Sequence, residues 1–199
     1  EYLREEEKGN ASKLTSFLNS VFTVYMYGMT AVCLLLIILM PWLAKLAAPG
    51  FTALQHIDLT LFSRIMLLSP FLFGLSSLLS SFAQVQKKFL AFAIAPVFYN
   101  VGILAGVLFL RPHFGMLGVV LGVVIGATMH FLIQIPPLAN LRKLPVFTKK
   151  VDWQIIKKVM VLSLPRTIGS SLSNVTFIIM AAIASLLTAG SISVFQLSY

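Results

Sequence analysis

Twenty consecutive residues without a charged side chain, VFTVYMYGMTAVCLLLIILM at positions 21–40, decide the class of fold. A helix of about 20 apolar residues spans the roughly 30 Å hydrocarbon layer of a bilayer. Four further apolar blocks follow, near residues 59–82, 89–110, 114–138 and 159–187. None of these blocks belongs to a series of alternating, barrel-type strands. The sequence therefore predicts an all-α fold, a polytopic bundle of transmembrane helices.

The overall composition supports this class. Of 199 residues, 58% are hydrophobic and 11% are charged, whereas soluble domains carry about 25% charged residues. The formal net charge is +9, but the basic residues gather in alternate loops, so we expect no nucleic-acid partner. The single cysteine, Cys33, excludes a disulfide framework. Glu1 is not an initiator methionine and Tyr199 falls within an opening helix, so we expect a fragment of a longer protein.

The loops differ in charge. When the loops are assigned alternately to the two sides, Arg111 and Lys45 lie on one side of the membrane. The other side holds eleven basic residues: Arg4, Lys8, Lys13, Lys87, Lys88, Arg142, Lys143, Lys149, Lys150, Lys157 and Lys158. Because short cytoplasmic loops carry the excess of Lys and Arg, the richer side is predicted to be cytoplasmic.

One connection is long and basic, and it predicts the domain organisation. Residues 1–140 would form part of an N-terminal lobe with four transmembrane helices. Residues 141–158, which include Trp153 among lysines, would form a cytoplasmic linker, and 159–199 would begin a C-terminal lobe. Lysines near anionic headgroups favour a linker that lies on the membrane surface. An ordinary basic loop that obeys the positive-inside rule remains an open alternative.

Groups for catalysis are scarce in this sequence. All six acidic residues are expected at or beyond the ends of helices, and the three histidines have no partner at metal-ligand spacing. No nucleophile elbow, phosphate-binding glycine loop or HExxH motif occurs. We therefore expect no enzyme activity, no metal and no cofactor.

The polar residues of the fifth span form the strongest candidate site. Arg166 is followed by Ser170, Ser173 and Asn174 at i+4, i+7 and i+8, which places them on one helical face. Because such a face is costly against lipid, it is predicted to line a cavity, where Arg166 would attract an anionic headgroup. The alternative is that Arg166 extends to the cytoplasmic surface and the serines only allow close packing.

Two further spans carry weaker signals. Arg64 is a second candidate substrate-binding residue, although extension of its side chain toward the outer surface is the simpler account because it lies near the expected start of its span. Gly118, Gly122 and Gly126 form a doubled GxxxG pattern that predicts close packing against another helix.

The order of these features resembles the MurJ (MviN) family of lipid II flippases, within the superfamily of multidrug, oligosaccharidyl-lipid and polysaccharide exporters. The resemblance covers nearly the whole chain. It rests on APGF (48–51), SRIMLLSPFLFGLSSLLSSFAQVQKKF (63–89), AIAPVFYNVGILAG (93–106), GMLGVVLGVVIGATMHFLIQIPPL (115–138) and SLPRTIGSSLSNVTFIIMAAIASLLTAGSIS (163–193).

The resemblance implies helices three to seven, and the start of the eighth, of a two-lobe transporter in the bacterial inner membrane. Its expected activity is translocation of an undecaprenyl-pyrophosphate-linked precursor, lipid II, by alternating access. The implied partners are this anionic lipid-linked oligosaccharide, membrane lipids and, as a possibility, cell-wall synthesis proteins. A polysaccharide-lipid or multidrug exporter and a non-transporting scaffold remain as alternatives. The functional arginines and acidic residue of the family lie in helices outside this chain, so none is carried over.

Overall fold

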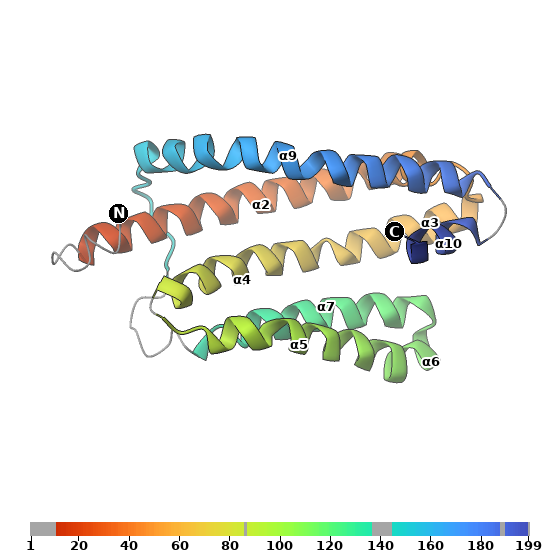
Figure 1. Cartoon of the computed structure of the whole chain (residues 1–199), viewed down its shortest axis with the longest axis horizontal. Helices are drawn as coiled ribbons and strands as arrows, with labels where there is room; N and C mark the ends of the chain where they lie inside the picture. Colours follow the sequence, from red (N-terminus) through yellow and green to blue (C-terminus); the bar gives the residue numbers. More distant parts are fainter. Residues whose placement is uncertain (1–10, 86, 137–144, 188–189, 199) are drawn as a thin grey trace. The chain divides into compact units, whose positions relative to one another are not determined.

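The computed structural model describes residues 11–85, 87–136, 145–187 and 190–198, but not the side chains of residues 11–15, 82, 85, 155, 166, 173 and 198. The described residues form helices and no strand (Figure 1). In chain order the helices are α2 (Ala11–Ala47), α3 (Ala53–Met66), α4 (Leu68–Val85), α5 (Leu90–Ala105), η1 (Gly106–Leu110), α6 (Arg111–Phe114), α7 (Met116–Leu132), α9 (Trp153–Ser185) and α10 (Ser191–Ser198). The predicted all-α class is confirmed.

The described helices are long enough for a membrane protein. Four segments have the length and composition to cross a bilayer: Ser16–Ala47, Ala53–Ser81, Leu90–Phe114 and Thr167–Ser185. Helix α7 is equally apolar but has 17 residues, which at 1.5 Å per residue span about 25 Å of the roughly 30 Å hydrocarbon layer. The prediction of a polytopic transmembrane bundle is confirmed.

The second predicted span begins earlier than expected, at Ala53 instead of residue 59. The Thr52 N–H donates to Gln55 Oε1 at 2.8 Å, and the Gln55 N–H donates to Thr52 Oγ1 at 3.4 Å. This reciprocal pair is a capping box, which satisfies amides that the first turn leaves open. As a consequence Asp58 lies inside α3, exposed, and the expectation that every acidic residue lies at or beyond a helix end was wrong for it.

Two other predicted bounds differ. The third span continues to Phe114 through η1, a π-helical turn in which the Arg111 N–H donates to Gly106 O. This wider turn ends two residues before Pro112, which has no N–H to donate. Helix α9 begins at Trp153, six residues before the expected start, directly after Asp152. An aspartate is favoured at the position before a first helical turn.

The chain separates into two compact units. The first comprises Glu1–Leu34 and Ile65–Asp152, and the second comprises Leu35–Arg64 and Trp153–Tyr199. The predicted division into 1–140, 141–158 and 159–199 stays a prediction, and residues 141–144 of its linker lie outside the described residues. Of the rest of the linker, residues 145–152 precede α9 and residues 153–158 form its first turns.

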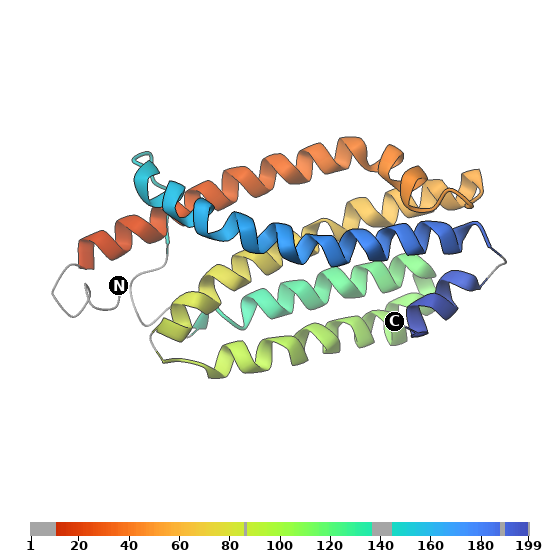
Figure 2. The same ribbon diagram turned by 45° about the horizontal axis from the view of Figure 1, so that its top comes forward.

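In the first unit, glycines set the distance between α5 and α7, which lie side by side (Figure 2). A Cβ built on Gly102 would collide with the backbone of Gly126. A Cβ on Gly122 would lie 2.6 Å from the Gly106 Cα, and one on Gly118 would strike the backbone at Leu110 and Arg111. The packing role predicted for the glycine pattern is confirmed.

The ends of the first unit differ in charge. Lys87 and Lys88 form the turn between α4 and α5, and Lys149 and Lys150 belong to the segment before α9. These two segments lie at the same end of the unit, whereas α6, which carries Arg111, lies at the other end (Figure 1). This segregation agrees with the side assignment made from the loop charges.

Candidate functional site

Helix α9 carries the candidate substrate-binding residues. It runs from Trp153 to Ser185, 33 residues, with Pro165 inside it. Positions four and eight apart share a face of a continuous helix, so the backbone brings Arg166, Ser170 and Asn174 into one row, with Ser173 beside it. The side chains of Arg166 and Ser173 lie outside the described residues. Contact of this face with a substrate stays a prediction.

The opposite face of α9 is apolar from Ile168 to Ile179. Ile168, Leu172, Val175 and Ile179 follow one another at helical spacing, and their side chains are 50% to 66% exposed within the chain. Such a face suits acyl chains. Arg166, Ser170 and Asn174 lie on the other side of the helix, and the expectation that their row turns away from lipid stays a prediction.

The polar side chains of α9 differ in how they are satisfied. Three hydroxyls donate to the carbonyl four residues earlier in the same helix: Thr167 to Ser163 O at 3.0 Å, Ser171 to Thr167 O at 2.8 Å and Thr176 to Leu172 O at 3.2 Å. The carboxamide of Asn174 is exposed and has no hydrogen-bond partner among the described residues. Because an amide needs two donors and an acceptor satisfied, Asn174 requires a partner from outside this set.

Arg64 lies deeper in its span than expected. It follows Ala53, the first residue of α3, by eleven residues, which corresponds to about 16 Å of helix. Its Nε donates to the Ile37 carbonyl oxygen of α2 at 3.0 Å within the second unit. The premise of a residue near the end of its span was therefore wrong, while its role in substrate binding stays a prediction.

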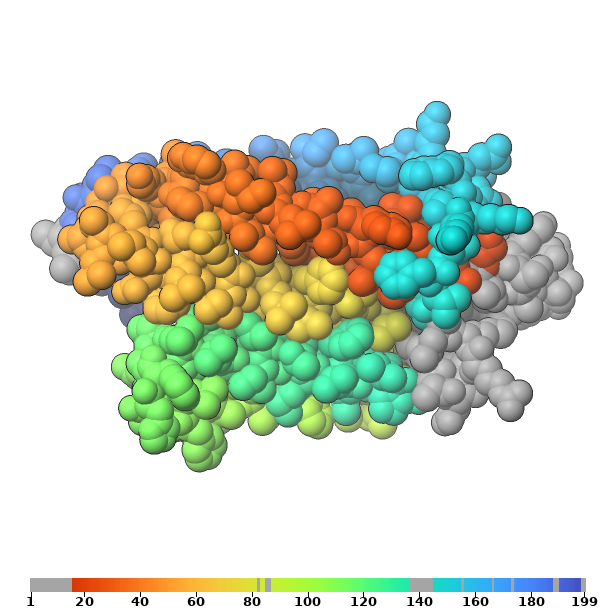
Figure 3. All heavy atoms as spheres, turned by 180° about the vertical axis from the view of Figure 1, so that it is seen from behind, coloured from red at the N-terminus to blue at the C-terminus, as the bar shows by residue number. Residues whose placement is uncertain are grey.

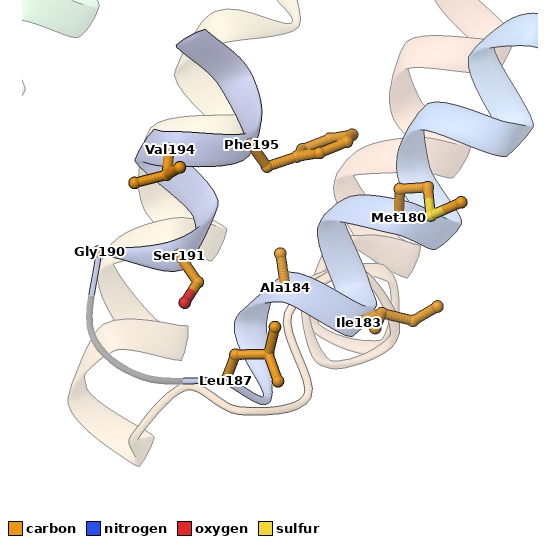
Figure 4. A pocket seen from close by; sticks show the side chains of 8 residues that line it. All are labelled: Met180, Ile183, Ala184, Leu187, Gly190, Ser191, Val194 and Phe195. Atoms are coloured by element: carbon orange, nitrogen blue, oxygen red, sulfur yellow. The ribbon is translucent and has the colours of Figure 1, made fainter. Parts of the chain in front are cut away.

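A hollow of about 520 Å³ lies in the second unit between the end of α9 and α10 (Figure 4). Its lining includes Met180, Leu187, Val194 and Phe195, and the described residues around it carry no charge. The Gly50 N–H donates to Ser185 Oγ at 3.3 Å next to this region. An apolar, uncharged hollow is poorly suited to an anionic headgroup, so it is not the candidate site.

A polar cluster in the first unit was missed from the sequence. Ser76 Oγ lies 2.8 Å from His130 Nδ1 and accepts a hydrogen bond from Gln134 Nε2 at 2.8 Å, while Ser80 Oγ donates to Gln134 Oε1. Ser76, Ser80 and Gln134 are at most 5% exposed. The pairs Ser76/Ser80 and His130/Gln134, each four residues apart, are visible in the sequence as two polar stripes, but the sequence does not show that the two stripes face each other. Because its members satisfy one another, the cluster joins α4 to the end of α7.

Comparison with known proteins identifies the family. The family model described as "Lipid II flippase MurJ" matches residues 1–199. The "Lipid II flippase MurJ" of Burkholderia cenocepacia is 28% identical over 137 residues, 66% of this chain and 27% of that protein. The "Probable lipid II flippase MurJ" of Buchnera aphidicola is 30% identical over 192 residues, 92% of this chain and 37% of that protein.

A third relative, the "Probable lipid II flippase MurJ" of Borreliella burgdorferi, is 28% identical over 201 residues, 98% of this chain and 38% of that protein. The chain thus spans well under half the length of these three relatives. The family match covers every residue, and the apolar helices suit a multi-pass inner-membrane protein. The chain therefore belongs to the MurJ lipid II flippase family.

Proposed function

We propose that the protein to which this chain belongs moves lipid II, an undecaprenyl-pyrophosphate-linked peptidoglycan precursor, from the inner to the outer leaflet. The observation that carries the proposal is the match of the whole chain to a family whose relatives are named for this activity. The polar face of α9 supplies the chemistry that such a substrate requires.

The physical problem is to move a sugar and pyrophosphate headgroup through hydrocarbon while its lipid tail stays there. Ionisable groups inside a membrane usually face a protein interior or a water-filled cavity. Arg166 supplies a positive charge for the pyrophosphate, and Ser170, Ser173 and Asn174 offer hydrogen bonds to its sugars. Alternating access between two lobes moves the opening of the cavity from one leaflet to the other.

A multidrug or cation exporter of the same superfamily is the competing function. It calls for carboxylates deep inside the spans. In the described spans, Asp58 is a carboxylate, but it lies five residues after the start of α3, near the end of its span. Arg64, by contrast, lies about three turns inside the same span, and the cationic residues favour an anionic substrate.

The test is translocation of lipid II by the full-length protein in proteoliposomes. Arg166→Ala is expected to lower the rate at least about tenfold, since a hydrogen bond to a charged group contributes roughly 1.5–3 kcal/mol. Arg166→Lys keeps the charge and should retain part of the rate. Ile168→Ala, on the apolar face of the same helix, is the matched control and should leave the rate unchanged.

Membrane abundance must be measured alongside the rate. Normal translocation by Arg166→Ala at normal abundance would contradict a role for Arg166 at the headgroup. A scaffold that does not transport predicts that neither the wild type nor any variant translocates lipid II, whereas a drug exporter predicts transport of organic cations instead.

A further inference from the structure

The segment that precedes α9, residues 145–152, is bound along α2 in the first unit; we call it the strap. The Val146 N–H donates to Asn19 Oδ1 at 2.9 Å. The Thr148 N–H donates to Thr23 Oγ1 at 3.0 Å, and the Asp152 N–H donates to Ser20 Oγ at 3.1 Å. Three backbone amides of the strap thus find their acceptors in side chains of one helix.

Two of the three acceptor residues on α2 are buried. Ser20 is 0% exposed and Thr23 is 3% exposed, although both belong to a helix whose carbonyl groups offer the usual partners for hydroxyls. Their oxygens also accept the strap amides, because a hydroxyl can accept one hydrogen bond while it donates another. A buried hydroxyl that loses its partner is costly, so Ser20 and Thr23 favour the strap in its bound position.

Aromatic contacts and an internal turn fix the strap further. The ring of Phe147 lies 5.3 Å from that of Phe22 and 6.2 Å from that of Tyr27, both in edge-to-face orientation. Within the strap, the Lys150 N–H donates to Thr148 Oγ1 at 3.2 Å. Figure 3 shows the cyan atoms of this part of the chain against the red and orange atoms of α2.

The boundary between the two compact units falls at the end of the strap. Asp152 is the last residue of the first unit, and Trp153, the first residue of α9, begins the second part of the other unit. The bond from Asp152 to Ser20 therefore ties the residue directly before α9 to α2.

We propose that Ser20 and Thr23 are positioning residues that hold the strap on α2 throughout the transport cycle, so that any rearrangement of α9 starts at Trp153. This role rests on the proposed transport function. On this proposal, the strap part of the linker stays attached to α2 and does not detach to lengthen the connection before α9.

Hydrogen exchange of the full-length protein tests the attachment without any transport assay. Thr23→Val keeps the shape of the side chain and removes the acceptor, so the Thr148 amide should exchange about tenfold faster. Ser20→Ala should do the same for the Asp152 amide. Thr30→Val and Ser16→Ala, at exposed positions of α2, are matched controls that should leave both amides unchanged. Unchanged exchange in Thr23→Val and Ser20→Ala would overturn the attachment.

Cross-linking tests whether the strap stays bound during transport. Phe22→Cys and Phe147→Cys, introduced together in a Cys33→Ala background, are joined by a short thiol-specific cross-linker. The cross-linked protein should translocate lipid II within about twofold of the same variant before linking, because a strap that never leaves α2 loses nothing when it is tied there. If this pair does not fold, Asn19→Cys with Val146→Cys takes its place.

Two outcomes separate the failure of this role from the failure of the proposed function. Arrest on cross-linking, in a variant that translocates before linking, would overturn the positioning role and leave lipid II transport intact. A wild-type protein that translocates nothing would overturn the transport function and the role that rests on it, while the exchange data would still decide whether the strap is attached.

Discussion

Replacing Gly122 by alanine is the smallest change that tests the packing of α5 on α7. The added Cβ would lie 2.6 Å from the Gly106 Cα, 3.1 Å from the Gly106 N and 3.2 Å from the Gly102 O. All three are backbone atoms, so no flexible side chain can move aside. The two helices must separate instead.

The size of the effect follows from that separation. Restoring an ordinary contact of 3.4 Å from 2.6 Å requires a shift of about 0.8 Å, and a gap of about 0.5–1 Å forfeits a quarter to a half of the dispersion energy between the facing atoms. Overpacking of this kind costs about 1–3 kcal/mol. The higher helix propensity of alanine offsets about 0.5–1 kcal/mol, so we expect a net loss of about 0.5–2 kcal/mol. Leucine should cost more.

The assay is unfolding of the purified full-length protein in graded denaturing detergent, followed by circular dichroism. Gly28→Ala in α2 is the matched control, because a Cβ built there meets nothing within 4 Å among the described residues. It should unfold at the wild-type detergent concentration or above it. A Gly122→Ala variant as stable as wild type, or a Gly28→Ala variant as weakened as Gly122→Ala, would refute the reasoning from backbone contact.

Two other changes test polar contacts inside the two units. Gln134→Leu removes the partner of both Ser76 and Ser80 and should lower the free energy of unfolding by about 1–3 kcal/mol. The control is Ser77→Ala, at an exposed position where the hydroxyl donates to Phe73 O of its own helix, and it should change this free energy by less than about 0.5 kcal/mol. Equal effects of the two substitutions would contradict a stabilising role of the buried cluster. Arg64→Met removes the donor to Ile37 O and should lower the thermal midpoint by a few degrees, about 1 kcal/mol, so an unchanged midpoint would show that this bond contributes nothing to folding.

The helices were predictable because their signal is strong and local. Long apolar blocks such as residues 21–40 need no information from the rest of the chain. The bounds were less predictable, since they depend on single interactions: the capping box of Thr52 and Gln55 extends α3 toward its start, and the π turn at Gly106–Leu110 extends the third span. The capping box was legible in the sequence as T-x-x-Q and was overlooked.

Contacts between helices were predictable only where a residue type has one common structural role in a membrane helix. Gly118, Gly122 and Gly126 predicted close packing because glycine offers little else in a membrane helix. The Ser76, His130 and Gln134 cluster was missed, because finding it requires the register of α4 against α7, which two separate i, i+4 pairs do not give. The strap was missed for the same reason: its partners Asn19, Ser20 and Thr23 lie more than a hundred residues away.

Serines and threonines within the spans are weak indicators of a polar cavity. Ser77, Ser81, Thr167 and Ser171 all donate to the carbonyl four residues earlier, so they are satisfied whichever way their face turns. Their presence on α9 is therefore weak support for a solvated groove. A guanidinium or a carboxamide has more donors than its own helix can accept. The prediction of a substrate path along α9 thus depends mainly on Arg166 and Asn174, since Thr167 and Ser171 would suit a lipid-facing helix equally well.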